Sequence, residues 1–282
     1  MENLNINYDK TVSNATVSMI SAGAILVISV LIVLLVLVIK RWKGRFIPLA
    51  LGVLSYAVFG FMFSQLLMSV LSLIPNVDQS FTYNTNAYVV IYNILFATGF
   101  GIARWFTAKM MTDRYNRSGD VLMAGTGLAI GDTVITYALS MFTFFVYAQA
   151  ISANGLEKFI SDMFNSGMAE SDVITLYTSN VSQLVDSPAI LWFLIAVSAV
   201  LDIALNIMLF IVVYGVVRKQ VNYMYAYYAI IAQFVSNIMF QLYNAFSLTN
   251  IIVLFIVKLV IVGGIVLFIK QFIMKEIKYS ND

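Results

Sequence analysis

The amino-acid sequence predicts an all-α membrane protein, a polytopic bundle of transmembrane helices. Of its 282 residues, 61% are hydrophobic and only 11% are charged, and the mean hydropathy is +0.90. Globular domains average roughly 45–50% apolar and about 25% charged residues, so little of this chain is expected outside a membrane. Apolar runs of about 20 residues, the length that crosses a bilayer core, recur along the whole sequence.

Seven such runs predict seven transmembrane helices within a single domain of residues 1–282. The spans are expected at residues 17–39, 46–74, 87–111, 121–150, 189–217, 223–247 and 249–274. The first run, from Val17 to Ile39, is too long for a cleavable signal and is followed at once by Lys40 and Arg41. This is a stop-transfer pattern, so we expect the run to remain as the first span.

The basic residues of the connections predict the orientation of the chain. One set of connections carries twelve of them, and the other set carries only Lys10 and Lys158. The twelve are Lys40, Arg41, Lys43, Arg45, Lys109, Arg114, Arg117, Arg218, Lys219, Lys270, Lys275 and Lys278. Because basic loops stay in the cytoplasm, we expect the N-terminus outside the cell membrane and the C-terminus inside. The basic residues are spread out and the net charge is only +2, so lipids are the expected surroundings and no nucleic-acid partner is expected.

The one long connection, residues 151–188, is predicted to be an external insertion between the fourth and fifth spans. It is acidic, with five carboxylates against Lys158, and its apolar residues predict two amphipathic helices. The apolar faces hold Leu156, Phe159, Ile160, Met163 and Phe164 in the first helix, and Val173, Tyr177, Val181 and Leu184 in the second. These helices are expected to lie along the outer membrane surface or to cap the bundle. Their role is either interfacial packing or that of a lid or partner-docking element.

Four charged residues fall inside the predicted spans: Arg104, Asp132, Asp202 and Lys258. Charges in the hydrocarbon region are costly and usually mark function. Two of these residues are positive and two are negative, and all four lie at comparable depth. This favours their pairing in the bundle interior. The pairs either fix helix packing or build a pocket for a ligand. A proton relay is less suited, because the sequence has no histidine.

The sixth predicted span carries a ladder of amide side chains on one helical face. Its members are Gln233, Asn237, Gln241 and Asn244. Amide side chains in lipid need hydrogen-bond partners from protein, and each interhelical hydrogen bond stabilises helix association by about 1 kcal/mol. The ladder therefore either holds helices together or forms a stripe that binds a ligand. Asn206, one turn after Asp202, is expected in the same interior. In the fourth span, Gly127 and Gly131 form a small-xxx-small pair that favours close helix approach.

The sequence assigns no catalytic residue, metal or cofactor. It has neither histidine nor cysteine, whereas a catalytic zinc site needs about three protein ligands, best supplied by those two residue types. Two minor catalytic alternatives stay open. One is a serine–lysine dyad of Lys258 with Ser198, Ser236 or Ser247. The other is an aspartyl dyad of Asp132 and Asp202, although the sequences around them lack the usual signatures of aspartyl intramembrane proteases.

Three segments resemble a known family in order and spacing: residues 99–106, residues 124–132 and residues 198–202. They are similar to the motifs Glu-Glu-x-x-Arg, Gly-x-Gly-His-Gly-Gly-x-Glu and His-x-x-x-Asp of the YhfC-type intramembrane metallopeptidases, which are distantly like the CAAX proteases and bacteriocin-processing enzymes. Arg104, Asp132 and Asp202 match the arginine and the two acids that end these motifs. The glutamates and histidines of the family fall on Phe100, Gly101, Leu128 and Ser198.

The resemblance implies a relative that has kept the polar scaffold and lost the metal ligands, and therefore a pseudoprotease rather than an enzyme. The expected function is binding of a membrane-embedded peptide or partner protein, in a scaffold, regulatory or immunity role. The expected binding residues are Arg104, Asp132, Asp202, Asn206, Lys258, Gln233 and Asn237. The alternative is a transporter or permease subunit, in which the paired charges line a solute path.

Overall fold

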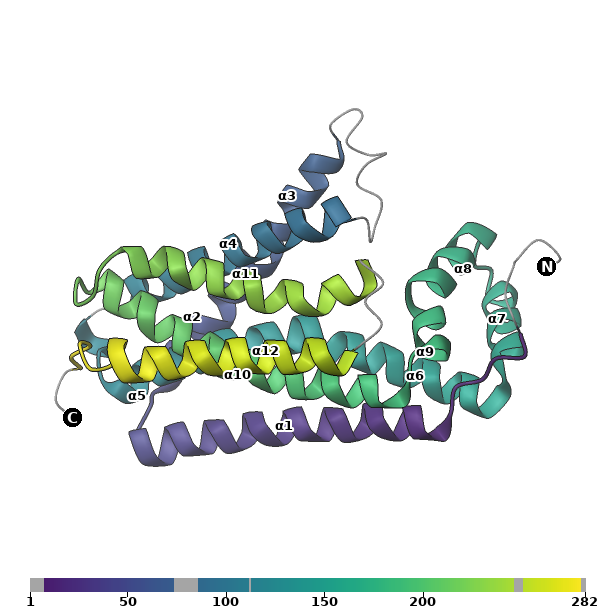
Figure 1. Ribbon diagram of the computed structural model, residues 1–282, viewed down its shortest axis with the longest axis horizontal. Coiled ribbons are helices and arrows are strands. Elements are labelled where there is room, and N and C mark those ends of the chain that lie inside the picture. Colours follow the sequence, from purple (N-terminus) through teal and green to yellow (C-terminus); the bar gives the residue numbers. More distant parts are fainter. Residues whose placement is uncertain (1–7, 74–85, 112, 246–250, 280–282) are drawn as a thin grey trace. The chain divides into compact units, whose positions relative to one another are not determined.

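The computed structural model describes residues 8–73, 86–111, 113–245 and 251–279, and within these ranges the chain is helical and has no strand (Figure 1). Six helical stretches are long and apolar enough to cross a membrane. They are Asn14–Trp42, Phe46–Leu71, Ala87–Met110, Ser118–Asn154, Ala189–Val217 and Ile251–Ile273. The predicted all-α character is therefore confirmed for the described residues, and the six helices are compatible with the predicted membrane protein.

The six stretches correspond to the first five and the last of the seven predicted spans. The predicted span at 223–247 overlaps helix α11 (Met224–Ala245), which has 22 residues but is not among the six. Tyrosine and amide side chains interrupt its apolar sequence, and its length alone does not decide whether it crosses.

The chain divides into two compact units. Unit 1 comprises Met1–Ile28 and Thr136–Val197, and unit 2 comprises Ser29–Ile135 and Ser198–Asp282. Three elements run from one unit into the other: α1 (Asn14–Trp42), η3 (Thr133–Ala138) and α10 (Ala189–Val217). The predicted binding residues all belong to unit 2.

Unit 1 contains the predicted insertion as four short helical elements that follow α6 (Leu139–Asn154). They are α7 (Leu156–Asn165), α8 (Glu170–Leu176), η4 (Tyr177–Val181) and α9 (Ser182–Asp186). Glycines with positive φ, Gly155 at 84° and Gly167 at 86°, end α6 and separate α7 from α8, since other residues rarely adopt this backbone conformation. Several residues of the predicted apolar faces are buried: Leu156, Ile160, Val173, Val181 and Leu184.

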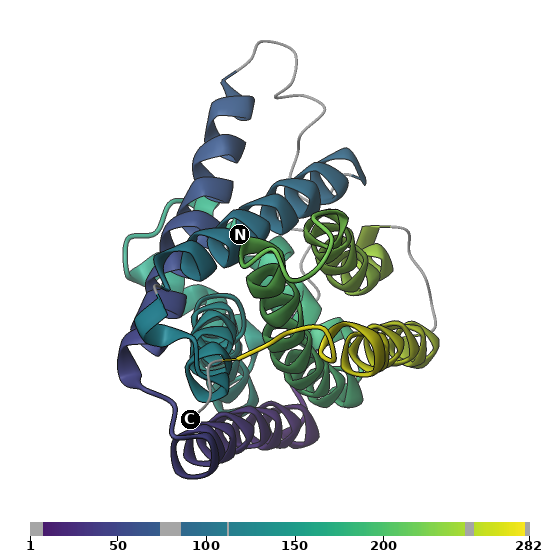
Figure 2. The same ribbon diagram turned by 90° about the vertical axis from the view of Figure 1, so that its left-hand side faces the viewer.

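Unit 2 contains the candidate site, and Figure 2 shows some of its helices, such as α11 and α12, nearly end-on. The unit includes α2 (Phe46–Ser55), η1 (Tyr56–Met62), α3 (Phe63–Ser72), α4 (Asn86–Met110), η2 (Asp113–Tyr115) and α5 (Ser118–Asp132). It also includes α11, α12 (Ile251–Phe268) and η5 (Ile269–Ile273). α2 packs on α5, and α4 packs on both η1 and α11.

Glycines bring α2 and α5 together. A Cβ atom on Gly127 would lie 2.1 Å from the carbonyl oxygen of Leu49, and one on Gly52 would lie 2.3 Å from that of Ala124. A Cβ atom on Gly131 would lie 2.9 Å from the ring of Tyr56. No larger residue fits at Gly52 or Gly127 without moving a backbone, or at Gly131 without moving the side chain of Tyr56. The predicted small-xxx-small pair therefore serves this contact and sets Tyr56 beside the end of α5.

Candidate functional site: a buried polar cluster

The candidate site is centred on Arg104 of α4. Its side chain is completely buried, and its Cζ atom lies 4.2 Å from the ring centroid of Phe100, one turn earlier. A cation over an aromatic face is stabilised by roughly 0.5–2 kcal/mol, most where solvent is excluded. The Nη2 atom of Arg104 donates to Asn206 Oδ1 at 2.8 Å and also to Gln233 Oε1. The guanidinium is therefore held by an aromatic face and two amide oxygens.

Asn206 of α10 connects Arg104 to Asp132. Its Nδ2 donates to Asp132 Oδ2 at 2.8 Å, while its Oδ1 accepts from Arg104. The hydroxyl of Tyr56 donates to the other carboxylate oxygen of Asp132 at 3.1 Å. Two opposite charges thus share one neutral amide. Each charge gains hydrogen bonds that offset part of the large cost of removing it from water.

Helix α11 extends the cluster along its amide ladder. Gln233 is completely buried, and its Nε2 donates to Asn237 Oδ1 at 3.0 Å. One turn of the predicted ladder is therefore engaged with Arg104. The side chains of Gln241 and Asn244 lie outside the described residues, so the rest of the ladder stays a prediction.

Arg104 also has unused hydrogen-bond donors. Within the described part of the chain, neither its Nε nor its Nη1 has an acceptor. A buried donor without an acceptor costs about 1–3 kcal/mol, and more when it is charged, so native structures rarely contain one. Donors of this kind suit a carbonyl or carboxylate oxygen brought by another molecule.

The cluster coincides with two irregular helical turns. The π-helical η1 begins at Tyr56, and the π-helical η3 begins at Thr133, directly after Asp132. π-Helical turns are rare and occur frequently at functional sites, because the extra residue redirects side chains. The two residues that share a hydrogen bond therefore each lie where a regular helix changes.

Asp202 and Lys258 form a second polar group with Ser236. Lys258 Nζ donates to Asp202 Oδ2 at 2.8 Å, and Ser236 Oγ donates to Asp202 Oδ1 at 3.0 Å. The Lys258 side chain is 3% exposed and that of Asp202 is 22% exposed. Both donors are directed to one carboxylate. In this arrangement Lys258 Nζ and Ser236 Oγ both donate to Asp202, so the serine hydroxyl is directed to the carboxylate, whereas a serine–lysine dyad would require it to donate to the lysine.

The seven predicted binding residues therefore fall into two groups. Arg104, Asp132, Asn206, Gln233 and Asn237 form one hydrogen-bonded chain, whereas Asp202 and Lys258 pair with each other. The expected pairing of four charges holds directly for the second pair, while Arg104 and Asp132 are connected through Asn206. Sequence reasoning did not identify the roles of Tyr56 and Phe100, which have no polar signature within an apolar run.

The positions where the resembled family carries its metal ligands are apolar or small in this chain. Phe100 and Leu128 are completely buried, and a Cβ atom on Gly101 would lie 2.6 Å from the side chain of Ile230. Among the described residues, no three His, Cys, Asp or Glu side chains come together. These residues do not fit a zinc site, which needs about three nitrogen, sulfur or carboxylate ligands.

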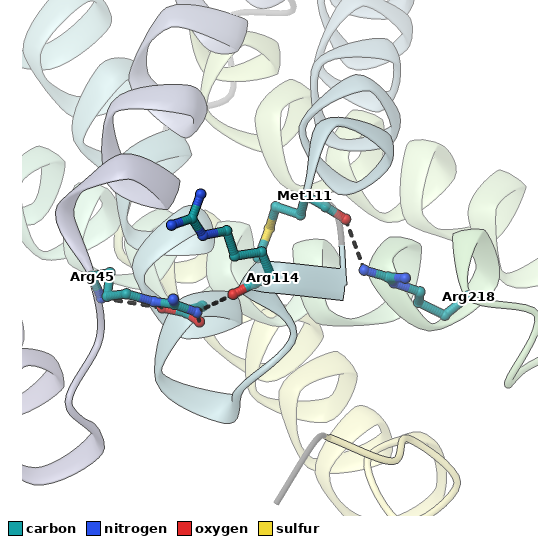
Figure 3. Close-up of polar contacts among 5 residues, drawn as sticks. Arg45, Met111, Arg114 and Arg218 are labelled. Carbon is teal, nitrogen blue, oxygen red and sulfur yellow. Dashed lines mark hydrogen bonds and ion pairs between the residues drawn. The ribbon is translucent and has the colours of Figure 1, made fainter. Parts of the chain in front are cut away.

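A separate polar contact holds the end of unit 2 where α5 begins (Figure 3). Arg45 donates from Nε to Asp120 Oδ1 at 2.9 Å and from Nη2 to Asp120 Oδ2 and to the carbonyl of Arg114. The hydrogen bond to Asp120 raises the pKa of Arg45 above its ordinary value. Arg218 Nη2 donates to the carbonyl of Met111 at 2.8 Å. These contacts tie the connections before α2, before α5 and after α10 together.

Comparison of the chain with protein-family models, with curated proteins and with solved structures found no match. The resemblance to the YhfC-type family therefore rests on the three sequence motifs alone.

Proposed function

We propose that this protein is a non-catalytic membrane protein that binds a membrane-embedded peptide segment or partner protein at the cluster around Arg104. The observation that carries the proposal is the pair of buried donors on Arg104, Nε and Nη1, that have no acceptor among the described residues. Nη2 is already used by Asn206 and Gln233, so these two atoms are the donors left for a ligand.

The ligand is defined by what these donors can bind. A guanidinium presents a planar fork that matches a carboxylate or two carbonyl oxygens. A peptide in a membrane has such oxygens to offer where its helix is interrupted or ends, because no water is there to satisfy them. Arg104 is completely enclosed, so a ligand reaches it only when the helices around it, such as α4, α10 and α11, move apart.

The proposal also includes the topology and the origin of the protein. We place it in the cell membrane with seven spans, counting α11, and with the N-terminus outside and the C-terminus in the cytoplasm. Support comes from the twelve basic residues on one set of connections against two on the other. A pseudoprotease of the YhfC type would use this polar cluster for binding after losing its metal ligands.

Photo-cross-linking in native membranes tests the binding proposal. A photoreactive residue in place of Asn237 stands one turn from Gln233, so it should cross-link to a peptide or partner protein bound at Arg104. Arg104→Lys keeps the charge but removes the fork, and it should reduce the cross-linked product about tenfold, the loss of one charge-assisted hydrogen bond. Arg218→Lys, a matched change at the polar contact beside Met111, should leave it unchanged.

Two results would contradict the proposal. One is a cross-linked product that Arg104→Lys and Arg218→Lys affect equally. The other is stoichiometric zinc in the same purified sample, which would point to an active metallopeptidase. Loss of solute uptake by proteoliposomes on Asp132→Asn, with cross-linking unchanged, would favour the transporter alternative.

A further inference from the structure

Two adjacent glycines of α12 are not explained by packing within the described chain. Of the 15 glycines, eleven lie so close to a neighbour that an added Cβ would meet it, and Gly155 and Gly167 have a positive φ. Only Gly263 and Gly264 have neither property, and nothing lies within 4 Å of a Cβ built on them. A glycine inside a helix costs about 1 kcal/mol relative to alanine. The space beside these glycines is therefore left open at a cost to helix stability.

Gly264, but not Gly263, lines an apolar cavity of about 300 Å³ between α10, α11 and the end of α12. Its walls include Leu209 and Val212 of α10, Tyr228 and Ala232 of α11, and Phe268 of α12. All of the lining residues are apolar or tyrosine, and they belong to unit 2. The cavity therefore suits a hydrocarbon occupant rather than a polar one.

The cavity lies at the end of unit 2 that carries exposed lysines. Lys219 follows α10, Lys270 lies in η5, and Lys275 and Lys278 follow η5, all of them exposed. The C-terminal segment is held at this end, because Gln220 Nε2 donates to the carbonyl of Lys278 at 2.9 Å and the amide of Lys278 donates back at 3.2 Å. We call Lys219, Lys270, Lys275 and Lys278 the basic rim.

Size and charge together select the occupant. An α-helix with its side chains is about 10 Å across. A single acyl chain is narrower, and a lipid carries its charge at the interface, where tyrosines and lysines concentrate. Basic pockets between transmembrane helices bind anionic headgroups. Among residues 269–279 the basic rim has three lysines against one acid, Glu276, so it complements a negative headgroup.

We propose that this cavity binds one acyl chain of an anionic phospholipid whose phosphate lies among the lysines of the basic rim. The site is separate from the Arg104 cluster, so the two proposals stand or fall independently. The lipid would fill the space beside Gly264 and join α11 to α12 without a direct helix–helix contact there.

Native mass spectrometry of the full-length protein in detergent tests the proposal, with phosphatidylglycerol and phosphatidylcholine as probes. The wild-type protein should retain one phosphatidylglycerol at least tenfold more tightly than phosphatidylcholine. Gly264→Leu should weaken both lipids about tenfold by filling the cavity, and Gly264→Ala should weaken them about fourfold, the effect of roughly one methylene. Gly263→Leu should leave both affinities unchanged.

The headgroup is tested separately. Lys270→Gln combined with Lys275→Gln should remove the preference for phosphatidylglycerol while retaining chain binding. Equal wild-type affinity for the two lipids, or equal effects of Gly264→Leu and Gly263→Leu, would overturn the proposal. So would a change from dimer to monomer on Gly264→Leu, because a second copy of the chain would then be the occupant. Thermal unfolding of each variant identifies misfolding, and Gly264→Ala, which meets no atom within 4 Å, keeps the test valid if the leucine variant does not fold.

Discussion

The Arg104 cluster depends on one neutral residue more than on either charge. Asn206 is completely buried and uses both ends of its amide, accepting from Arg104 and donating to Asp132. A bidentate amide between two charges satisfies both without requiring them to touch. Removing it would leave a guanidinium and a carboxylate that each lose a charge-assisted bond in a medium without water.

Asn206→Leu should therefore lower the free energy of unfolding by about 3 kcal/mol or more, since each hydrogen bond to a buried charge contributes about 1.5–3 kcal/mol. The control is Asn237→Leu. Asn237 is half-buried, and its replacement removes one hydrogen bond between neutral amides, so the free energy of unfolding should fall by about 1 kcal/mol. Thermal or denaturant unfolding of the purified proteins in detergent measures both. An equal decrease in the free energy of unfolding for the two variants would show that the hydrogen bonds of Asn206 to Arg104 and Asp132 do not stabilise the fold.

At this scale, the sequence identifies a polar residue well when it interrupts an apolar run. Arg104, Asp132, Asn206 and Gln233 were predicted as interior residues for this reason, and the structure joins them by hydrogen bonds. Tyr56 was not predicted, because the chain has 16 tyrosines and nothing in their spacing separates a buried hydroxyl donor from an interfacial ring. Its role depends on the contact of η1 with α5.

Among the secondary-structure elements, the length of the apolar runs predicted where helices lie. It did not predict where an α-helix passes into a π-helical turn. The predicted spans 46–74 and 121–150 each contain an α-helix that passes into a π-helical turn, η1 or η3, and back. A π-turn accommodates one extra residue in an otherwise continuous apolar run, so neither length nor hydropathy reports it. Gly127 and Gly131, in contrast, predicted that another helix approaches α5 closely, although the sequence did not indicate that this helix is α2.

Gly127→Ala should separate α2 from α5, because its Cβ would lie 2.1 Å from a backbone oxygen that cannot turn aside. We expect a loss of about 1–3 kcal/mol in the free energy of unfolding, as for other overpacked sites. Gly263→Ala is the matched control: the same change in a helix with open space should be neutral or stabilising by up to about 1 kcal/mol. The midpoints of thermal unfolding in detergent compare the two. An unchanged midpoint for Gly127→Ala would mean that α2 and α5 are not packed through this glycine.

For the whole molecule, the open question is whether α11 crosses the membrane. Six stretches qualify as spans by length and composition, and α11 is a 22-residue helix whose amides lower its hydropathy. One of these amides, Gln233, binds Arg104, and a second, Asn237, binds Gln233, so residues that build the cluster also weaken the sequence signal for the span. The number of spans also sets the side on which the chain ends, because each span reverses it.

The absence of cysteine makes this question directly testable, since single-cysteine variants carry no background. Seven spans predict that Ser166→Cys, between α7 and α8, reacts with a membrane-impermeant maleimide in intact cells. Asn222→Cys and Glu276→Cys should react only after permeabilisation. All three positions are exposed, so burial does not limit their labelling. If α11 did not cross, the last span would run the other way, and Glu276→Cys would be labelled from outside like Ser166→Cys while Asn222→Cys stayed protected.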